Sequence, residues 1–284
     1  MPAGFSRASG SIQKLDLTDS SAVESLLSST RPAIVVHTAA ERSPDRCVSD
    51  PMATTALNVD STAHLSQLCA RLGATLIYIS TDYVFPGRPG EAPYAASTPT
   101  EPPNFYGETK LAGERAVLAQ PAGVVLRVPV LYGDVEENKE SAVNVLLDVV
   151  WNSNGKRTVH MDDWSIRYPT NTEDVARVLV DIAERYRDGN GEALPRVLQF
   201  SSEERMTKYE ICTVLADVAG LPVDHIVANA ENDPKAAGTL LFPLGVKRGR
   251  DWANVAANEG LRTGASATSV RLSFVDARTQ GFGD

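Results

Sequence analysis

Cysteine is scarce in this sequence, and long apolar runs are missing from it. Cys47, Cys69 and Cys212 are widely spaced, and none of them belongs to a CxxC pair. This spacing argues against a disulfide framework and against a zinc site, and it fits a reducing compartment. No apolar stretch approaches the roughly 20 residues that a membrane-spanning helix needs.

Other classes of protein are disfavoured by what the chain lacks. The N-terminal stretch MPAGFSRASGS has no apolar core of the kind that a signal peptide needs. The formal net charge of −9 argues against nonspecific binding to nucleic acid or to a membrane surface. We therefore expect a cytoplasmic protein with no nucleic-acid or membrane partner.

Histidine is also rare, and its placement gives no sign of a metal site. His64, His160 and His225 show no ligand spacing with one another or with the cysteines. His37 ends an apolar run, and we interpret it as a buried, hydrogen-bonded side chain rather than a catalytic one.

The pattern of apolar residues along the chain predicts an α/β fold. Short apolar runs rich in β-branched residues alternate with amphipathic segments from residue 11 to about residue 220. Four runs are apolar on both faces and are predicted to be buried strands, at residues 33–38, 75–80, 124–128 and 197–201. This alternation indicates right-handed crossovers and a doubly wound, Rossmann-type parallel sheet.

Helix boundaries have local signals. Between the first two strands, apolar residues share one face of a helix that Gly73 is expected to end. Two capping-box spacings predict helix starts, Ser21 with Glu24 and Thr207 with Glu210.

Tyr106 and Lys110 are the first candidates for chemistry. They are four residues apart, so on a helix they point the same way, one turn from each other. An ammonium group there favours the phenolate and lowers the tyrosine pKa from about 10. Such a tyrosine can exchange a proton with a carbonyl oxygen near neutral pH. The alternative is an exposed lysine beside a packed tyrosine.

Ser80 and Thr81 favour the proton-transfer interpretation. They end a predicted buried strand, at the carboxyl edge where open α/β sheets bind ligands. A hydroxyl at that edge could hydrogen-bond the same carbonyl oxygen as Tyr106.

The stretches STDYVFPG, NFYGETKLAGERAV and LRVPVLYG resemble the extended short-chain dehydrogenase/reductase family, in its dTDP-4-dehydrorhamnose-reductase-like branch. The resemblance implies Thr81, Tyr106 and Lys110 as the catalytic trio. It makes Tyr106 the general acid and base, and it gives Lys110 a second role on the nicotinamide ribose.

The same resemblance implies NADP, or NAD, as cofactor. Ala39 and Ala40 would line it, Asn58 matches the family's asparagine in the next helix, and Asp16 matches the acidic position near the adenine. The family also opens with a strand and a GxxGxxG turn that holds the pyrophosphate at a helix N-terminus. Neither GxxGxxG nor GxGxxG occurs here, so we expect nucleotide binding by this chain to be weak or absent.

A missing first strand would leave a sheet edge to be filled. The segment at residues 11–17 is expected to be the family's third strand. It would pair directly with the strand at 33–38 or leave that edge open, which is an aggregation liability.

Further stretches are similar to the regulatory β-subunit family of methionine adenosyltransferases. They are VVHTAAERSPD, LNVDSTAHL, ESAVNVLLDVV, MDDWSIRYPT and RMTKYEI. The AAERSPD and DDWSIRYPT stretches separate that family from the sugar reductases. The resemblance extends from residue 4 to about residue 227, and it implies the catalytic adenosyltransferase subunit as partner and a role in S-adenosylmethionine biosynthesis.

The resemblance also predicts the domain organisation. Residues 1–228 would form a truncated dinucleotide-binding domain, with a small substrate-type lobe interleaved at about 134–172 and 200–228. Residues 229–284 are poor in apolar residues and are expected to be a divergent, poorly ordered tail.

Two questions stay open at this point. Arg167, in the stretch DDWSIRYPT, is either an anion-binding substrate contact or the partner of the preceding aspartates in a salt bridge. The function is either that of a regulatory β-subunit-like protein or that of an NADPH-dependent dTDP-4-dehydrorhamnose reductase. A truncated chain without function is a third alternative.

Overall fold

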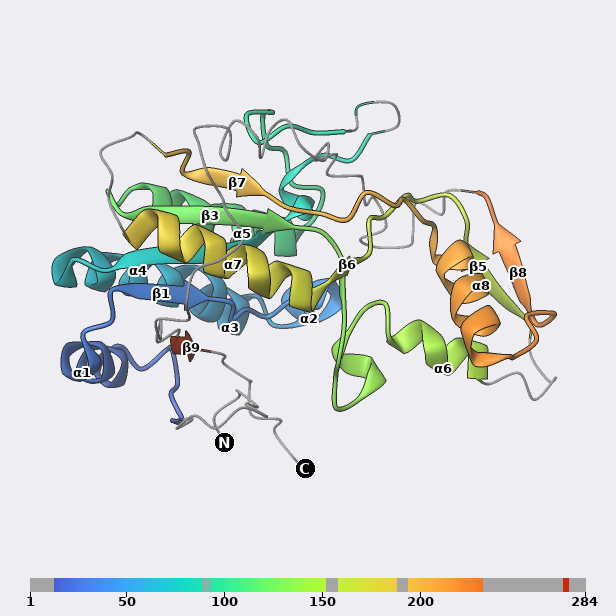
Figure 1. Ribbon diagram of the computed structural model, residues 1–284, viewed down its shortest axis with the longest axis horizontal. Coiled ribbons are helices and arrows are strands. Elements are labelled where there is room, and N and C mark those ends of the chain that lie inside the picture. Colours follow the sequence, from blue (N-terminus) through green and yellow to red (C-terminus); the bar gives the residue numbers. More distant parts are fainter. Residues whose placement is uncertain are drawn as a thin grey trace, which may run out of the picture.

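The four predicted strands form one parallel sheet in the computed structural model, which describes residues 13–88, 91, 93–151, 158–187 and 194–231 and the backbone of 273–275 (Figure 1). They are β1 (Ile34–His37), β2 (Thr75–Thr81), β3 (Gly123–Val128) and β7 (Val197–Gln199). The order across the sheet is β7-β3-β2-β1-β9, in which β9 is Ser273–Val275. Every pairing in it is parallel, so the α/β prediction is confirmed.

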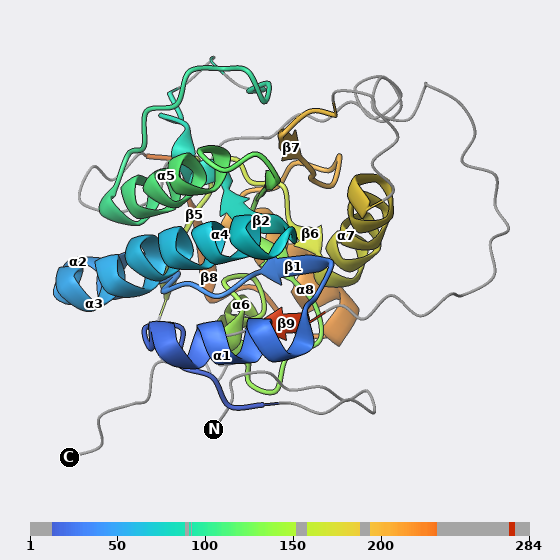
Figure 2. The same ribbon diagram turned by 90° about the vertical axis from the view of Figure 1, so that its left-hand side faces the viewer.

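Helices cover both faces of this sheet. On one face lie α1 (Ser20–Thr30), α4 (Ser61–Leu72) and α5 (Phe105–Leu118), and on the other lies α7 (Thr172–Arg187). Figure 2 shows α4 and α5 on one side and α7 on the opposite side. Neighbouring residues of β1 point to opposite faces, so Val35 packs in the first core and Val36 in the second. A buried side chain of this kind contributes roughly 1.5–3 kcal/mol.

The chain between β1 and β2 is almost entirely helical. It passes through α2 (Pro44–Ser49), α3 (Pro51–Thr55) and a π-helical turn, η1 (Ala56–Asp60), before α4. A proline opens both α2 and α3, where its missing N–H and fixed φ suit the first turn. Gly73 ends α4 at φ 71°, in the left-handed region, as predicted.

One of the two predicted helix starts is wrong. The capping residue of α1 is Asp19, whose carboxylate accepts hydrogen bonds from the backbone N–H groups of Ser21 and Ala22. A carboxylate placed before the helix reaches these free donors, so Ser21 already lies inside the first turn. The second prediction is confirmed, because Thr207 and Glu210 satisfy each other's backbone N–H groups at the start of α8 (Lys208–Ala219).

The strand expected at residues 11–17 is not formed in its described part, residues 13–17. Asp16 accepts hydrogen bonds from both the backbone N–H and the hydroxyl of Thr18, and this turn directs the chain into α1. Leu17 is buried in the first core instead of lying along β1. On the side away from β2, the neighbour of β1 is β9, which belongs to the tail expected to be poorly ordered. The rest of that tail beyond residue 231 lies outside the described residues.

A second, separate core lies beside the main sheet, on the right in Figure 1. Around it pack α6 (Val145–Trp151), β5 (Val159–Asp162), α8 and β8 (Ile226–Asn229). The strands β5 and β8 pair in parallel, as do β4 (Leu131–Tyr132) and β6 (Thr170–Asn171). A short 3-10 turn, η3 (Asn138–Glu140), lies between β4 and α6. No helix in the described part of the chain is long and apolar enough to cross a membrane.

Candidate functional site

The carboxyl end of β2 brings the predicted catalytic residues together. Thr81 is the last residue of β2, and Tyr106 and Lys110 lie in the first turns of α5. Asn104 caps that helix by accepting the N–H of Gly107 at 2.9 Å. A Cβ on Gly107 would overlap the carbonyl oxygen of Tyr83, so only glycine lets α5 approach the strand end this closely.

Lys110 is buried and held against β2. Its Nζ donates to the carbonyl oxygen of Ile79 at 2.7 Å and lies 4.0 Å from the centre of the Tyr78 ring. Burial lowers the pKa of Lys110 to about 7, although the nearby Glu114 carboxylate acts to raise it. The ammonium group is therefore desolvated and easily neutralised.

Tyr106 is paired with Thr81 rather than with Lys110. Burial and the neighbouring Asp82 raise the pKa of Tyr106 above the usual 10, and the hydrogen bond with the Thr81 side chain opposes this rise only in part. The expectation that Lys110 lowers the pKa of Tyr106 is therefore wrong. The physical reason is that the Lys110 ammonium donates to the Ile79 carbonyl and that burial disfavours its charged form.

Asp82 is a member of the site that the sequence did not suggest. It follows Thr81 in the 3-10 turn η2 (Asp82–Val84) and is 7% exposed. The hydroxyl of Thr81 donates to its Oδ1 at 3.1 Å. Burial raises the pKa of Asp82 to about 7, against the opposing effects of Thr81 and Arg167. An acidic residue directly after a buried strand was the signal that could have revealed it.

Asn58 fixes the loop that follows β1, where Ala39 is buried and Ala40 is partly exposed. Its Oδ1 accepts the N–H of Glu41 at 2.8 Å, and its Nδ2 donates to the Glu41 carbonyl at 2.9 Å. The same Nδ2 also donates to the hydroxyl of Thr109 at 3.1 Å, on α5. Asn58 therefore ties the loop beside Ala39 and Ala40 to the helix that carries Tyr106 and Lys110.

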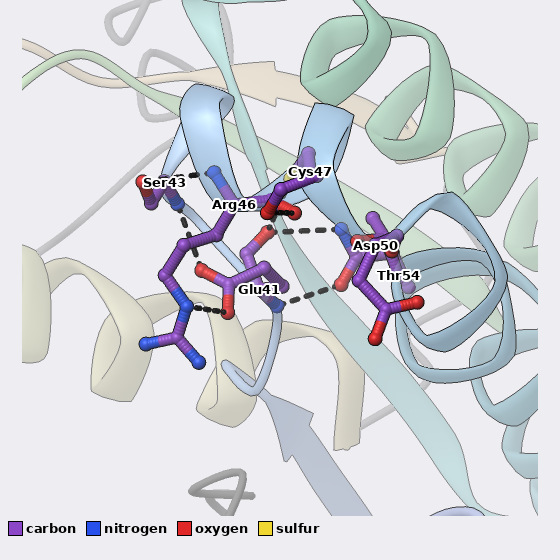
Figure 3. Close-up of polar contacts among 8 residues, drawn as sticks. Glu41, Ser43, Arg46, Cys47, Asp50 and Thr54 are labelled. Carbon is purple, nitrogen blue, oxygen red and sulfur yellow. Dashed lines mark hydrogen bonds and ion pairs between the residues drawn. The ribbon is translucent and has the colours of Figure 1, made fainter. Parts of the chain in front are cut away.

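The AAERSPD stretch folds into a polar turn that Figure 3 shows. The Glu41 carboxylate accepts the N–H of Ser43 at 3.0 Å and forms an ion pair with Nε of Arg46 at 3.1 Å. Ser43 caps α2, and Cys47 directs its thiol at the Glu41 carbonyl at 3.6 Å. The Arg46 side chain is thus largely exposed, while the Glu41 side chain with which it pairs is largely buried.

The two remaining candidate site residues, Asp16 and Arg167, are each bonded to neighbouring residues. Asp16 is exposed and lies in the turn before α1, where its carboxylate is used by Thr18. The buried Arg167 forms an ion pair with Asp162 at 2.9 Å and donates to the Ser165 carbonyl at 2.7 Å. The salt-bridge interpretation of Arg167 is therefore the one that the structure shows. Burial raises the pKa of both Asp82 and Tyr83, and the charge of Arg167 partly opposes this rise in each, so Arg167 lies near enough to the site to act on it.

His37 is buried, and its Nε2 lies 2.9 Å from the hydroxyl of Thr62. Burial lowers the pKa of His37 to about 3, and Lys110 acts in the same direction. The imidazole is therefore neutral, as a structural histidine should be. Within the described residues, no group of three or more acidic, histidine or cysteine side chains could hold a metal ion.

Hydroxyl and ammonium groups lie near the end of β2. The hydroxyls of Thr81 and Tyr106 pair there, and the Lys110 ammonium, which has three donors, lies against the Ile79 carbonyl of the same strand. Among the described residues, no glycine-rich turn opens a helix to offer backbone donors to a pyrophosphate.

Comparisons with known proteins agree with this geometry. The family model described as the RmlD substrate binding domain matches residues 2–239. Methionine adenosyltransferase 2 subunit beta of Xenopus tropicalis is 43% identical over 224 residues, which is 78% of this chain and 65% of the relative. The corresponding subunit of Rattus norvegicus is 44% identical over 225 residues, with the same shares of both chains. The chain thus spans about 65% of the length of these curated relatives.

Solved structures show the same fold. The dTDP-4-dehydrorhamnose reductase of Bacillus anthracis, determined in complex with NADP, superposes with a TM-score of 0.67 at 23% identity. The match covers 76% of this chain and 72% of the reductase.

Proposed function

This chain belongs to the family of the RmlD substrate binding domain, and from that premise we propose that it is a regulatory, β-subunit-like protein of methionine adenosyltransferase. The observation that carries the proposal is the 43–44% identity to β subunits over 78% of the chain. The partner is then the catalytic adenosyltransferase subunit, the process is S-adenosylmethionine biosynthesis, and the compartment is the cytoplasm.

Kinetics of the catalytic subunit test this proposal. We expect added chain to change the KM or kcat of a methionine adenosyltransferase from the same source, saturating as the chain reaches the concentration of the enzyme. The matched control is a dTDP-4-dehydrorhamnose reductase, which shares the fold without the high identity to β subunits. Unchanged kinetics at a several-fold molar excess of the chain would refute the regulatory role.

We further propose that the end of β2 is a nicotinamide-nucleotide site for NADP or NAD. Thr81, Tyr106 and Lys110 would contact the nicotinamide and its ribose, while Ala39 and Ala40 would line the nucleotide. The bound nucleotide would supply hydride chemistry, and this chain's own residues would hold and move a proton. The absence of a glycine-rich turn among the described residues supports low affinity.

Three other residues take part in the proposed site in different ways. Asn58 would act by positioning the loop of Ala39 and Ala40, since Glu41 and Thr109 use its amide. Asp16 would lie toward the adenine end. Arg167, whose charge acts on Asp82, would contact a substrate. The elements around the second core would form the substrate-type lobe.

The second candidate function is reduction of a 4-keto nucleotide sugar. The hydrogen bond between Thr81 and Tyr106, with Lys110 one turn away, favours it. NADPH oxidation with dTDP-4-dehydrorhamnose should then be measurable and should be lost in Tyr106→Phe. Tyr186→Phe, which removes a hydroxyl on α7 that donates to the Pro195 carbonyl, serves as the control and should keep the activity. Absence of NADPH oxidation in the unmodified chain would remove this candidate.

A further inference from the structure

Tyr106, Lys110 and Glu114 form a row along one face of α5. Each is four residues from the next, so the row runs down the helix side that faces β2 and β3. The carboxylate of Glu114 is 1% exposed. It lies one turn beyond Lys110 and about two turns beyond Tyr106.

Three donors from two strands converge on the Glu114 carboxylate. Arg127 on β3 donates from Nε to Oε1 at 2.9 Å and from Nη2 to Oε2 at 2.7 Å. Ser80 on β2 donates its hydroxyl to Oε1 at 2.5 Å. The Ser80 hydroxyl is bonded to Glu114. At this strand end it is therefore the Thr81 hydroxyl that pairs with Tyr106.

Arg127 is itself held in place on other sides. Its Nη1 donates to the Ala96 carbonyl at 3.1 Å, and its guanidinium carbon lies 5.0 Å from the centre of the Phe85 ring. The side chains of this ion pair are 5% and 2% exposed. The bidentate ion pair and its further contacts hold the Glu114 carboxylate in one position inside the protein.

Stability alone does not explain such a pair. Removing two charges from water costs free energy, and apolar side chains of similar volume often stabilise a core equally well. The pair does have an electrostatic neighbour, Lys110, whose other contacts are the Ile79 carbonyl and the Tyr78 ring. His37 on β1, on which Lys110 acts electrostatically, is neutral and adds no charge beside the ammonium.

We propose that Glu114 is a positioning residue that favours the charged form of Lys110 beside the end of β2, and that Arg127 and Ser80 hold its carboxylate for this role. Glu114 and Lys110 bond to adjacent residues of β2, Glu114 to the Ser80 hydroxyl and Lys110 to the Ile79 carbonyl. Burial disfavours the charged form of Lys110, and the Glu114 carboxylate acts against it by raising the pKa of the lysine. The inference deepens the proposed nucleotide site and rests on the role proposed there for Lys110. It assigns the buried pair to the electrostatics of the site.

The test replaces both charges together. Glu114→Gln alone would leave the Arg127 charge buried and unpaired, which threatens folding. The double variant Glu114→Met with Arg127→Met keeps the volume and removes both charges. A second neutral pair, Glu114→Gln with Arg127→Gln, keeps polar contacts in case the apolar pair packs poorly.

The readout is the pKa of Lys110 itself. It is followed by NMR of protein labelled with ¹³C at the lysine Cε, with the signal assigned through Lys110→Arg. We expect the pKa to fall in either double variant, by a few tenths of a unit to about one unit, because loss of the Arg127 charge offsets only part of the loss of the Glu114 carboxylate. A double variant of the exposed pair Glu24 and Arg71, changed to Gln, is the control and should leave the Lys110 pKa unchanged.

The outcomes separate this inference from the proposed nucleotide site. A Lys110 pKa that is unchanged in a folded double variant would show that the buried pair is structural only. A lowered pKa supports the inference, and it needs no nucleotide to be observed. A separate titration of the unmodified chain with NADP that shows no binding would refute the nucleotide site and leave the electrostatic role of Glu114 standing.

Discussion

Burial sets the charges of the side chains at the end of β2. Lys110 and Asp82 are both buried, and burial moves the pKa of each to about 7 from opposite directions. The spacing of Tyr106 and Lys110 predicted that these residues point the same way on one helix, and both lie in α5. It could not predict Asp82 or the Glu114–Arg127 pair as members of the site, because their burial depends on strands distant in the sequence.

The sequence contained one sign of the buried Glu114–Arg127 ion pair, a charged residue inside an apolar run. Arg127 interrupts the run VVLRV, and a charge there requires a buried partner. The sequence offered several acidic residues for that partnership. Only the packing of α5 on β3 selects Glu114.

Asp82 makes a testable contribution to stability. Its folded pKa of about 7 exceeds the ordinary 3.8, so the folded state binds this proton more tightly than the unfolded state. The stabilisation is fully present below about pH 4 and is lost as the pH rises through 7. Asp82→Asn removes the carboxylate and can still accept the Thr81 hydrogen bond. We expect the variant to be more stable than the unmodified chain at pH 8, by on the order of 3 kcal/mol, and nearly equal to it at pH 4.

Urea unfolding of both proteins at pH 4, 6 and 8 measures this difference. An advantage of the variant that grows from pH 4 to pH 8 supports the buried carboxylate. The same difference at all three pH values would contradict it.

At the scale of elements, the apolar runs of the sequence predicted most strands correctly. They failed for the segment before α1, which forms a turn instead of a strand. The runs at 33–38, 75–80, 124–128 and 197–201 form strands because burial on both faces of a sheet demands apolar residues throughout. The segment before α1 also looked like a strand. Its residues Asp16 and Asp19 instead satisfy backbone donors in a turn and a helix cap.

The helix cap gives a prediction for α1. Asp19→Ala should lower the free energy of unfolding by about 1 kcal/mol, because two backbone N–H groups lose their acceptor. Ser21→Ala should change it by no more than a few tenths of a kcal/mol, since Ser21 is not the cap. Thermal or urea unfolding of the two variants compares them. A larger loss in Ser21→Ala would restore the capping box expected from the sequence.

The close approach of α5 to β2 gives another prediction. In Gly107→Ala the new Cβ would overlap the Tyr83 carbonyl, so α5 must shift away from the strand end. We expect a loss of about 1–3 kcal/mol in the free energy of unfolding. Glu108→Ala, at the next and exposed position of the same helix, is the control and should be close to neutral. Equal stability of both variants would contradict the tight contact.

At the scale of the whole molecule, the chain builds two cores from interleaved segments. The strands β5 and β8 pair in register, with Val159 opposite Ile226, although α7 and β7 of the main sheet lie between them in the sequence. Composition and periodicity alone do not reveal such a pairing, since it depends on segments that meet only in the folded chain. The resemblance predicted two lobe segments, at about 134–172 and 200–228, and this division remains a proposal.

The proposed partner follows from the likeness of the chain to the β subunits, which extends through both cores. The direct measurement is sedimentation velocity of this chain mixed with the catalytic subunit of methionine adenosyltransferase, at concentrations of each near 10 µM, a choice suited to complexes with a Kd of about 1 µM or tighter. We predict a new, faster-sedimenting species that contains both proteins, and none when the dTDP-4-dehydrorhamnose reductase replaces this chain. Two independent boundaries at the positions of the separate proteins would contradict the proposed function.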